Sequence, residues 1–311
     1  AGQPEANYVM ERLIEAAARE TGIDALELRR RNHIPAEAMP YRTPVDVTYD
    51  SGEYDNNLRK AMDLADWQGF ETRKAASASR GLLRGRGVAN YIQVAVGVPF
   101  EWGALRVKPD GVVEIRSGTH NHGQGHETVF AQLIVDRLGV PFESVRLING
   151  DTAVIPRGQG THGSRSMILA GPLIAINSEK IIEKARQITA LRLEASEADI
   201  EFVDGRLAVD GTDLSLGLFD VAAIAESDET LPDELRGPLA AESDYTTPDA
   251  TYPSGTHICE VEVDAETGSV RLDRFTAIDD VGRAINPMIL FGQSHGGIAQ
   301  GVGQALLEDC R

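Results

Sequence analysis

Gly118-Thr-His-Asn-His-Gly-Gln-Gly-His-Glu-Thr-Val129 sets the organisation of this chain. A strand pattern at residues 111–116 precedes it and a helical pattern at residues 128–138 follows it. A strand, a glycine-rich turn and a helix present backbone N–H groups and the positive end of the helix to an anion. Gly123 and Gly125 let the backbone approach a ligand closely, and Gln124 between them offers a donor and an acceptor. The stretch therefore predicts a ligand-binding turn.

Two later stretches have the same character. They are Gly158-Gln-Gly-Thr-His-Gly-Ser-Arg-Ser166 and Gln293-Ser-His-Gly-Gly-Ile-Ala-Gln-Gly-Val-Gly303. Each is rich in glycine, carries small polar side chains, and leads into or lies on an apolar helical pattern. Three such elements suggest one large, polar ligand that bears phosphate and is contacted by backbone from several directions.

Composition narrows the class of protein. The 311 residues are enough for two lobes with cores of their own, and the formal net charge of −18 argues against a nucleic-acid partner. Cys259 and Cys310 lack the spacing of a disulfide framework or an iron–sulfur site, which favours a reduced, cytoplasmic protein. No apolar run has the length of a membrane span. The chain starts without methionine and stops at the end of an apolar helical pattern, so we expect it to be part of a longer protein.

Hydrophobic periodicity predicts an α+β fold, with mixed sheets and packed helices, in two lobes that divide near residue 80. The first lobe, 1–79, has helical patterns, with a break at Gly22 and a capping Asp24. The second, 80–311, opens with strands and a βαβ unit formed by strand 112–116, helix 128–138 and strand 144–149. The remaining expected elements are helix 166–193, hairpin 199–209, helix 218–225, a surface loop at 226–249, strands 256–264 and 269–278, and a helix from Asn286-Pro287 onward.

His120, His122 and His126 allow a zinc or di-metal site, because neutral imidazoles are good zinc ligands. Their spacing, however, straddles a glycine turn and does not lie on one face of a helix or strand. Only Glu127 could add a carboxylate. We therefore expect no metal here and keep a His-cluster zinc hydrolase as an alternative.

The stretch from Gly163 to Ser166 also allows two interpretations. In one, Ser166 is simply the N-cap of the following helix. In the other, the hydroxyls of Ser164 and Ser166, the loop amides and Arg165 bind a phosphate or a pterin edge. Catalysis by Ser164 is not expected, because the Gly-x-Ser-x-Gly context is absent.

Three further residues, Gln300, Asp280 and Cys259, can each be explained by a structural role without ligand contact. Gln300 and its neighbouring glycines suit either close helix packing or cofactor contact. Asp280, followed by Val-Gly, is typical of a turn acceptor more than of a metal ligand. Cys259, which alternates with apolar neighbours, is expected to be a small core residue.

Taken in order, these stretches resemble the molybdenum-binding large subunit of the molybdenum hydroxylases, the group of xanthine dehydrogenase, aldehyde oxidase and carbon monoxide dehydrogenase. The resemblance covers nearly the whole chain, and it implies that residues 1–79 are the helical tail of a first cofactor-binding lobe and residues 80–311 a second molybdopterin-binding lobe. Its most specific runs are Val261-Glu-Val-Asp-Ala-Glu-Thr-Gly268, Asp279-Asp-Val-Gly-Arg-Ala-Ile-Asn-Pro287 and Gly292-Gln-Ser-His-Gly-Gly-Ile-Ala-Gln-Gly-Val-Gly-Gln-Ala-Leu306. It also includes Ala1-Gly-Gln-Pro-Glu-Ala6 and a helix that ends in Leu28-Arg-Arg-Arg-Asn32.

The resemblance implies which residues contact a molybdopterin cofactor, in its cytosine dinucleotide form. The implied contacts are Gly2, Gln3, Gly123, Gln124, Gly125, Gly163, Ser164, Arg165, Ser166 and Gln300. It also implies hydroxylation of a C–H bond of an aldehyde or N-heterocycle with oxygen from water, or oxidation of carbon monoxide. FAD and [2Fe–2S] partner subunits would accept the electrons, in a dimer of heterotrimers.

The resemblance also predicts what this chain lacks. The catalytic glutamate of the family follows a Gly-Val-Gly-like segment, whereas Gly303 is followed here by Gln304 in a different helix. An arginine that the family supplies ahead of the first loop is missing too. No catalytic residue can be named, and we expect the chain to be a C-terminal portion that is inactive alone. A cofactor-binding or assembly partner without catalysis of its own is the other reading.

Overall fold

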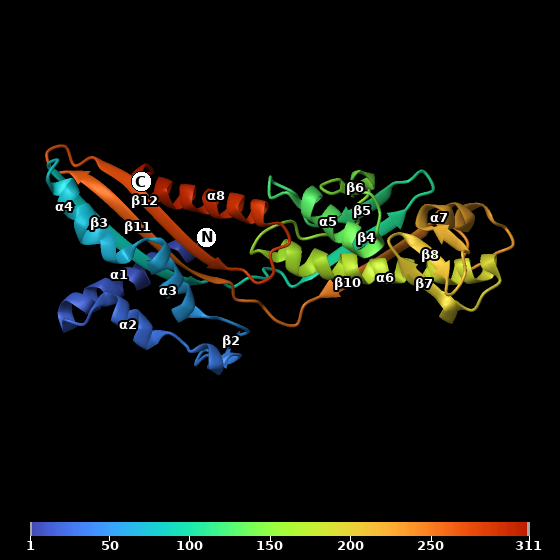
Figure 1. Cartoon of the computed structure of the whole chain (residues 1–311), viewed down its shortest axis with the longest axis horizontal. Coiled ribbons are helices and arrows are strands. Elements are labelled where there is room, and N and C mark those ends of the chain that lie inside the picture. The colour runs from blue at the N-terminus through green and yellow to red at the C-terminus, as the bar shows by residue number, and fades with distance from the viewer. Residues whose placement is uncertain (1, 310–311) are drawn as a thin grey trace. The chain divides into compact units, whose positions relative to one another are not determined.

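A computed structural model describes residues 2–309 (Figure 1). Ala1 of the predicted first loop, Cys310 and Arg311 lie outside the described residues. The α-helices are α1 (Gln3–Thr21), α2 (Ala25–Asn32), α3 (Tyr54–Leu64), α4 (Phe70–Ala78), α5 (His126–Leu138), α6 (Arg165–Leu193), α7 (Leu218–Ser227) and α8 (Pro287–Leu306). The strands are β1 (Tyr41–Arg42), β2 (Thr48–Tyr49), β3 (Leu82–Ile92), β4 (Phe100–Val107), β5 (Val113–Ser117), β6 (Val145–Ile148), β7 (Ile200–Val203), β8 (Arg206–Val209), β9 (Ser215–Gly217), β10 (Leu239–Thr246), β11 (Ser254–Asp264) and β12 (Val270–Asp280).

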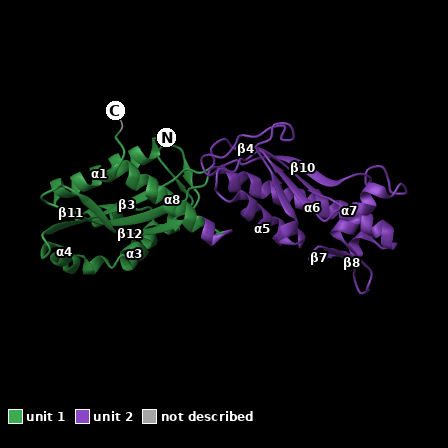
Figure 2. Ribbon diagram, turned by 90° about the horizontal axis from the view of Figure 1, so that it is seen from above, with its two compact units in different colours: residues 1–95, 251–284, 290–311 green, residues 96–250, 285–289 purple. Residues whose placement is uncertain are grey.

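The chain forms two compact units (Figure 2). Unit 1 contains residues 1–95, 251–284 and 290–311, and unit 2 contains residues 96–250 and 285–289. The predicted α+β class is confirmed: helices and four separate sheets are present in the described residues. The lobes predicted at 1–79 and 80–311 concern cofactor-binding lobes of the family, and that boundary stays a prediction.

Unit 1 is built on an antiparallel sheet of order β12-β11-β3. Alternate residues of β11 point to opposite faces. One face carries Ile258, which packs with Ala61 of α3 and Ala65 beyond it. His257 and Cys259 lie on the other face, where Cys259 is only half-buried. Cys259 was expected to be a small core residue, but it is only partly buried. The reason is that helices α3 and α4 cover the opposite face of the sheet.

A buried ionic network lies on the covered face of this sheet. Glu260 and Glu262 of β11 are each 2% exposed. Arg84 of β3 donates to both carboxylates, at 2.6 and 3.1 Å, and Arg73 of α4 donates to Glu260 at 2.6 Å. Buried carboxylates need such partners, because an unpaired charge in a protein interior is strongly unfavourable. The network thereby fixes α4 against the sheet.

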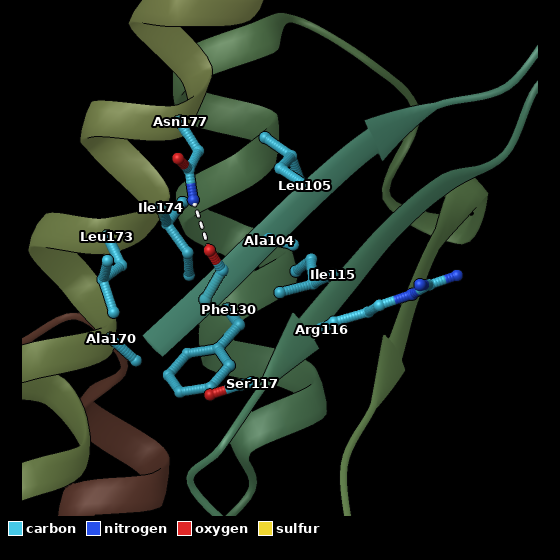
Figure 3. A pocket seen from close by; sticks show the side chains of 11 residues that line it. Ala104, Leu105, Ile115, Arg116, Ser117, Phe130, Ala170, Leu173, Ile174 and Asn177 are labelled. Carbon is cyan, nitrogen blue, oxygen red and sulfur yellow. Dashed lines mark hydrogen bonds between the residues drawn. The ribbon is translucent and has the colours of Figure 1, made fainter. Parts of the chain in front are cut away.

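Unit 2 contains a four-stranded sheet of order β10-β4-β5-β6. Strands β5 and β6 are parallel and are joined through α5, so the predicted βαβ unit is confirmed. Helices α5 and α6 pack against this sheet around Phe130, Leu105 and Ile174. The space among these side chains is only about 10 Å³ (Figure 3). That volume is about one water molecule, so the packed interior of unit 2 is a core and not a binding pocket.

Strand β10 overturns one expectation. Residues 226–249 were expected to form a surface loop, but Leu239–Thr246 pairs antiparallel with the whole of β4. Burial alternates along this strand, starting from the buried Leu239. The strand lies at the sheet edge, where one face and one border meet solvent, which explains its polar composition.

The other predicted elements are confirmed within a few residues, including the hairpin at 199–209, the strands at 256–264 and 269–278, and the helix that begins at Pro287. None of the helices within residues 2–309 is long and apolar enough to cross a membrane.

Candidate functional site

The turn from Gly123 to Gly125 joins β5 to α5 as the sequence predicted. Gly123 and Gly125 have φ angles of 109° and 77°, which is the left-handed region that favours glycine. Gly125 is the N-cap of α5, and no side chain caps this helix end. A side chain at Gly125 would also meet Ile289 Cδ1 at 2.8 Å. The turn therefore leaves amides of the first helical turn available to a ligand.

The side chain of Gln124 is half-buried, and only one of its two polar atoms is hydrogen-bonded to a described residue. Its side-chain oxygen accepts a short hydrogen bond from the backbone N–H of His122. Its amide nitrogen has no hydrogen-bond partner among the residues that the structure describes. Gln124 can thus brace the turn with its oxygen and still donate to a ligand.

The second predicted stretch forms the N-terminus of α6. The helix begins at Arg165, so Ser166 lies inside its first turn and is not its N-cap. That structural alternative is wrong. The N-cap is Ser164, which has a φ of 57°, makes no capping hydrogen bond and is exposed. Ser166 is buried, and its hydroxyl lies 2.9 Å from that of Thr161. Ser164 is the hydroxyl that this loop presents to the outside.

The two loops touch through glycine backbones. A Cβ at Gly118 would lie 2.5 Å from Gly158 Cα, and one at Gly158 would clash with Gly118 in turn. Gly160 N also donates to Gly118 O at 3.2 Å. Only glycine permits this approach, because any side chain would force the two loops apart. Unit 2 thus brings the stretches around Gly118 and Gly163 together.

A buried ion pair lies next to this junction and is hydrogen-bonded to one of its loops. Arg165 Nη1 donates to Glu101 Oε2 at 2.6 Å, and both side chains are 0% exposed. The same nitrogen donates to Gly160 O at 2.6 Å, and the rest of the guanidinium bonds to the carbonyl oxygens of Val98 and Phe100. The side chain of Arg165 is therefore fully occupied inside the protein. Its backbone N–H donates to His162 O at 3.2 Å, so the suggested contact of Arg165 with a ligand is not favoured.

Glu101 belongs to this junction and was not predicted from the sequence. Its Oε1 accepts the N–H of Trp102 at 3.0 Å, while its Oε2 binds Arg165. The available signal was one carboxylate inside an otherwise apolar strand, Phe100-Glu-Trp102. Such a residue needs a buried cation, since lone buried carboxylates are rare.

The three histidines do not converge. The His126 ring stacks on Phe130, with centroids 5.1 Å apart and an 18° interplanar angle. Burial lowers the pKa of His126, and its Nδ1 is buried without a hydrogen-bond partner. His120 and His122 contact each other, with ring centroids 4.7 Å apart. Within residues 2–309 no three histidine, cysteine or acidic side chains are arranged to hold a metal ion.

The remaining predicted site residues belong to unit 1. Gly2 is the N-cap of α1, with a φ of 87°, and Gln3 is the first residue of that helix. Gln300 is exposed on α8, and Gln304 one turn later donates to Glu5 of α1 at 3.4 Å. Gly2, Gln3 and Gln300 therefore lie in unit 1, whereas the predicted residues of the two loops lie in unit 2.

Four of the five glycines of α8 make no close packing contact among the described residues, and only at Gly303 would a Cβ meet a neighbour, Glu308 Oε1, at 3.1 Å. No atom of the described residues lies within 4 Å of where a Cβ would sit at four of them, Gly292, Gly296, Gly297 and Gly301. Close packing within the chain therefore does not explain them. Asp280, by contrast, accepts the N–H of Gly282 at 3.2 Å, as a turn acceptor does.

Comparison with known protein families gives two matches, each described as a molybdopterin cofactor-binding domain. One model matches residues 60–311 and the other residues 1–33. The carbon monoxide dehydrogenase large chain of Hydrogenophaga pseudoflava is 37% identical over 97% of this chain and 39% of its own length. The 6-hydroxypseudooxynicotine dehydrogenase complex subunit gamma of Paenarthrobacter nicotinovorans is 32% identical over 99% of this chain and 39% of its own length.

Solved structures agree with these matches. A Cu,Mo-CO dehydrogenase in the carbon monoxide reduced state superposes with a TM-score of 0.84 at 35% identity, over 95% of this chain and 39% of that one. Quinoline 2-oxidoreductase from Pseudomonas putida 86 gives a TM-score of 0.87 at 32% identity, over 100% of this chain and 41% of that one. The chain therefore spans about two fifths of the length of these relatives.

Proposed function

Because this chain belongs to the molybdopterin cofactor-binding family of molybdenum hydroxylase large subunits, we propose that it forms the C-terminal cofactor-binding portion of such an enzyme. The complete enzyme would hydroxylate a C–H bond of an aldehyde or N-heterocycle with oxygen from water, or oxidise carbon monoxide. The carbon monoxide dehydrogenase large chain among the relatives supports the second reaction, and quinoline 2-oxidoreductase supports the first.

The observation that carries this proposal is the pair of uncapped helix N-termini in unit 2. Helices α5 and α6 both begin at a left-handed N-cap residue without a side-chain cap, Gly125 and Ser164. The Gly118–Gly158 contact joins the loops that lead to them. Two positive helix ends with free amides suit an anionic, hydrogen-bonding ligand such as a pterin with its phosphate.

Within this site we assign separate roles. The amide nitrogen of Gln124 would donate to the pterin, while its oxygen keeps the bond to His122. The hydroxyl of Ser164 would bind a pterin edge or phosphate oxygen. The Ser166 hydroxyl, which pairs with Thr161, and the Arg165 side chain would shape the loop. Gly123, Gly125 and Gly163 would provide close backbone approach.

Unit 1 would contribute Gly2, Gln3 and Gln300. The amides at the start of α1 lack a side-chain cap, and Gln300 is exposed. Gly301 next to it leaves open space beside α8. The molybdenum cofactor would supply the redox chemistry when bound, and the residues of this chain would hold and orient it.

The partners in this proposal are the remainder of the large subunit and separate FAD and [2Fe–2S] subunits, in a dimer of heterotrimers. Helices α1 and α8 support the first of these. Neither helix has a buried residue, and Tyr8 and Phe291 on them are 66% and 67% exposed. Large apolar side chains at that exposure suit a surface that another part of the subunit covers.

The cytosine dinucleotide form of the cofactor and a cytoplasmic location remain parts of the proposal. The free thiol of Cys259 is in keeping with a reducing compartment. A small molecule is the proposed substrate, and its identity would depend on residues beyond this chain.

Purification of the 311-residue chain tests the proposal as a whole. We expect it to contain no molybdenum and to leave an artificial dye unreduced with xanthine, aldehydes or carbon monoxide, since half a site forfeits much of the binding free energy. Co-expression with the rest of a large subunit should restore both properties. A chain that still fails to hold cofactor in that complex would favour an assembly role without catalysis.

Substitutions at Gln124 test the site itself in the complete subunit. Gln124→Ala should lower cofactor occupancy by the cost of one or two unpaired polar groups, on the order of 1–3 kcal/mol. Gln124→Glu keeps the acceptor for His122, removes the donor and adds a negative charge beside the anionic ligand, so it should lower occupancy as well. The control is Gln187→Ala on α6, whose side chain bonds only to Glu183. Molybdenum content and activity unchanged in both Gln124 variants would refute the assignment.

A further inference from the structure

One carboxylate in unit 1 joins four elements. Asp279 Oδ1 accepts hydrogen bonds from Tyr91 Oη of β3 and from His257 Nε2 of β11, each at 2.8 Å. Asp279 Oδ2 accepts a third bond from Ser294 Oγ of α8, also at 2.8 Å. Asp279 itself is on β12, so all three strands of the sheet and α8 meet at this side chain.

The sheet is adapted to this arrangement. Gly255 of β11 stands directly between Asp279 of β12 and Tyr91 of β3 in the strand register. A Cβ at Gly255 would lie 2.5 Å from Tyr91 Cε1 and 2.8 Å from Asp279 Oδ1. The missing side chain lets the tyrosine cross the central strand and reach the carboxylate. The imidazole of His257 packs edge-on against the Tyr91 ring at 5.6 Å.

Helix α8 has little else to hold it in unit 1. None of its residues is buried, and four of its glycines, Gly292, Gly296, Gly297 and Gly301, face open space among the described residues. Within the part of the helix that belongs to unit 1, the side-chain hydrogen bonds to other elements are Ser294 to Asp279 at 2.8 Å and Gln304 to Glu5 at 3.4 Å. The second is long and exposed. The bond to Asp279 is therefore the stronger tie.

We propose that Asp279 is the positioning residue for α8, and that through Ser294 it sets where Gln300 stands. The link to Gln300 rests on the proposed cofactor role of that residue. The positioning of α8 does not. Tyr91 and His257 hold the carboxylate from the sheet side with one oxygen, which leaves the other oxygen directed to the helix.

The carboxylate is suited to this task across the neutral range. Burial would raise the pKa of Asp279, but the hydrogen bonds from His257, Tyr91 and Ser294 outweigh burial and lower it to about 2. An ionised carboxylate accepts all three bonds at once, whereas an asparagine offers one acceptor oxygen and an NH₂ group that would face a donor.

Hydrogen exchange of the full 311-residue chain, followed by mass spectrometry, tests the positioning role. In Asp279→Asn and Ser294→Ala, amides of residues 292–306 should exchange about tenfold faster or more, because the helix loses a charge-assisted hydrogen bond. Exchange in α5 of unit 2 should stay near that of the original chain in both variants, and the urea midpoint of unfolding should stay near the original in Ser294→Ala, which leaves the bonds of Tyr91 and His257 to Asp279 in place. Ser294→Thr keeps the hydroxyl and should restore slow exchange.

The matched control is Asp280→Asn. It removes the same charge one residue later, where the side chain accepts only the N–H of Gly282. Equal acceleration of α8 in this control, or no acceleration in Ser294→Ala, would overturn the proposal. Where Asp279→Asn fails to fold, the comparison of Ser294→Ala with Ser294→Thr decides alone.

A second measurement separates this inference from the proposed function. In a complete, cofactor-loaded subunit, Ser294→Ala should speed release of the pterin while Ser294→Thr should not. Faster amide exchange in α8 with unchanged release of the pterin would support Asp279 as the positioning residue for α8 and would refute the role of Gln300. Unchanged amide exchange in α8 would refute the positioning of α8 by Asp279, regardless of the rate at which the pterin is released.

Discussion

Arg165 and Glu101 form a salt bridge of 2.6 Å in which neither side chain has any exposed surface. Arg165 begins α6 and Glu101 lies on β4, so the pair connects the start of the helix to the sheet. The guanidinium also bonds to Gly160 O, inside the loop that touches Gly118. The geometry of the two proposed cofactor loops therefore depends on one buried pair of charges.

Breaking this pair should destabilise unit 2 strongly. Glu101→Gln leaves the buried guanidinium without a counter-charge, and loss of one partner of such a pair typically costs about 3–5 kcal/mol. Urea unfolding followed by Trp102 fluorescence in a Trp67→Phe background measures it, since these are the two tryptophans of the chain. Glu101→Leu combined with Arg165→Met should cost less than either change alone. Additive costs would contradict the pairing.

Unit 2 should also lose stability as the pH falls below about 6.5. Burial lowers the pKa of His126 from its ordinary 6.5, so below that pH the unfolded chain takes up a proton that the folded chain resists. The free energy of unfolding of unit 2 should therefore decline with falling pH. His126→Gln should flatten this decline, while His162→Gln, at an exposed position that does not contribute to the shift of His126, should leave it unchanged. The same Trp102 signal measures both.

Unit 1 should be sensitive to stronger acid. Hydrogen bonds from Ser77 and Arg271 and the charges of nearby arginines lower the pKa of Glu262 from 4.5 to about 2. A depressed carboxylate pKa stabilises the fold above pH 4.5, and this contribution is lost as the pH falls toward 2. Unfolding measured by Trp67 fluorescence in a Trp102→Phe background should show that loss. Glu262→Gln should reduce its slope, whereas Glu266→Gln, in the exposed turn after β11, should not.

Elemental analysis of the purified chain should find less than stoichiometric zinc. The structure turns the ring of His126 onto Phe130, while His122 is exposed. Three imidazoles so arranged do not surround a tetrahedral ion. One tightly held zinc per chain that disappears in His122→Ala would support the hydrolase alternative.

Much of the fold follows from local sequence signals. Asp24 caps α2 by accepting from Leu26 N and Glu27 N, as its place before an amphipathic run predicts. Asn286-Pro287 starts α8, and Asn286 Oδ1 accepts from Ile289 N at 3.0 Å. Helix ends, turns and strand alternation depend on residues within a few positions of each other. A single sequence carries that information in full.

Strand β10 could not be found in this way. Its pairing partner β4 lies more than a hundred positions earlier, with Leu239 opposite Val107 and Thr246 opposite Phe100. The strand is acidic and lies at an edge, so its own composition resembles that of a loop. Only the backbone groups of β4, brought to it by folding, make it a strand.

The candidate site divides in the same way. The sequence by itself determined the glycine turn at Gly123–Gly125, the helix that follows it, and the resemblance to a cofactor-binding family. The tertiary structure alone decided that Arg165 faces inward to Glu101, 64 positions away, and that Asp279 ties Ser294 to the sheet. A turn or a cap is satisfied by its neighbours in the chain, whereas a buried charge is satisfied only by the partner that the fold delivers.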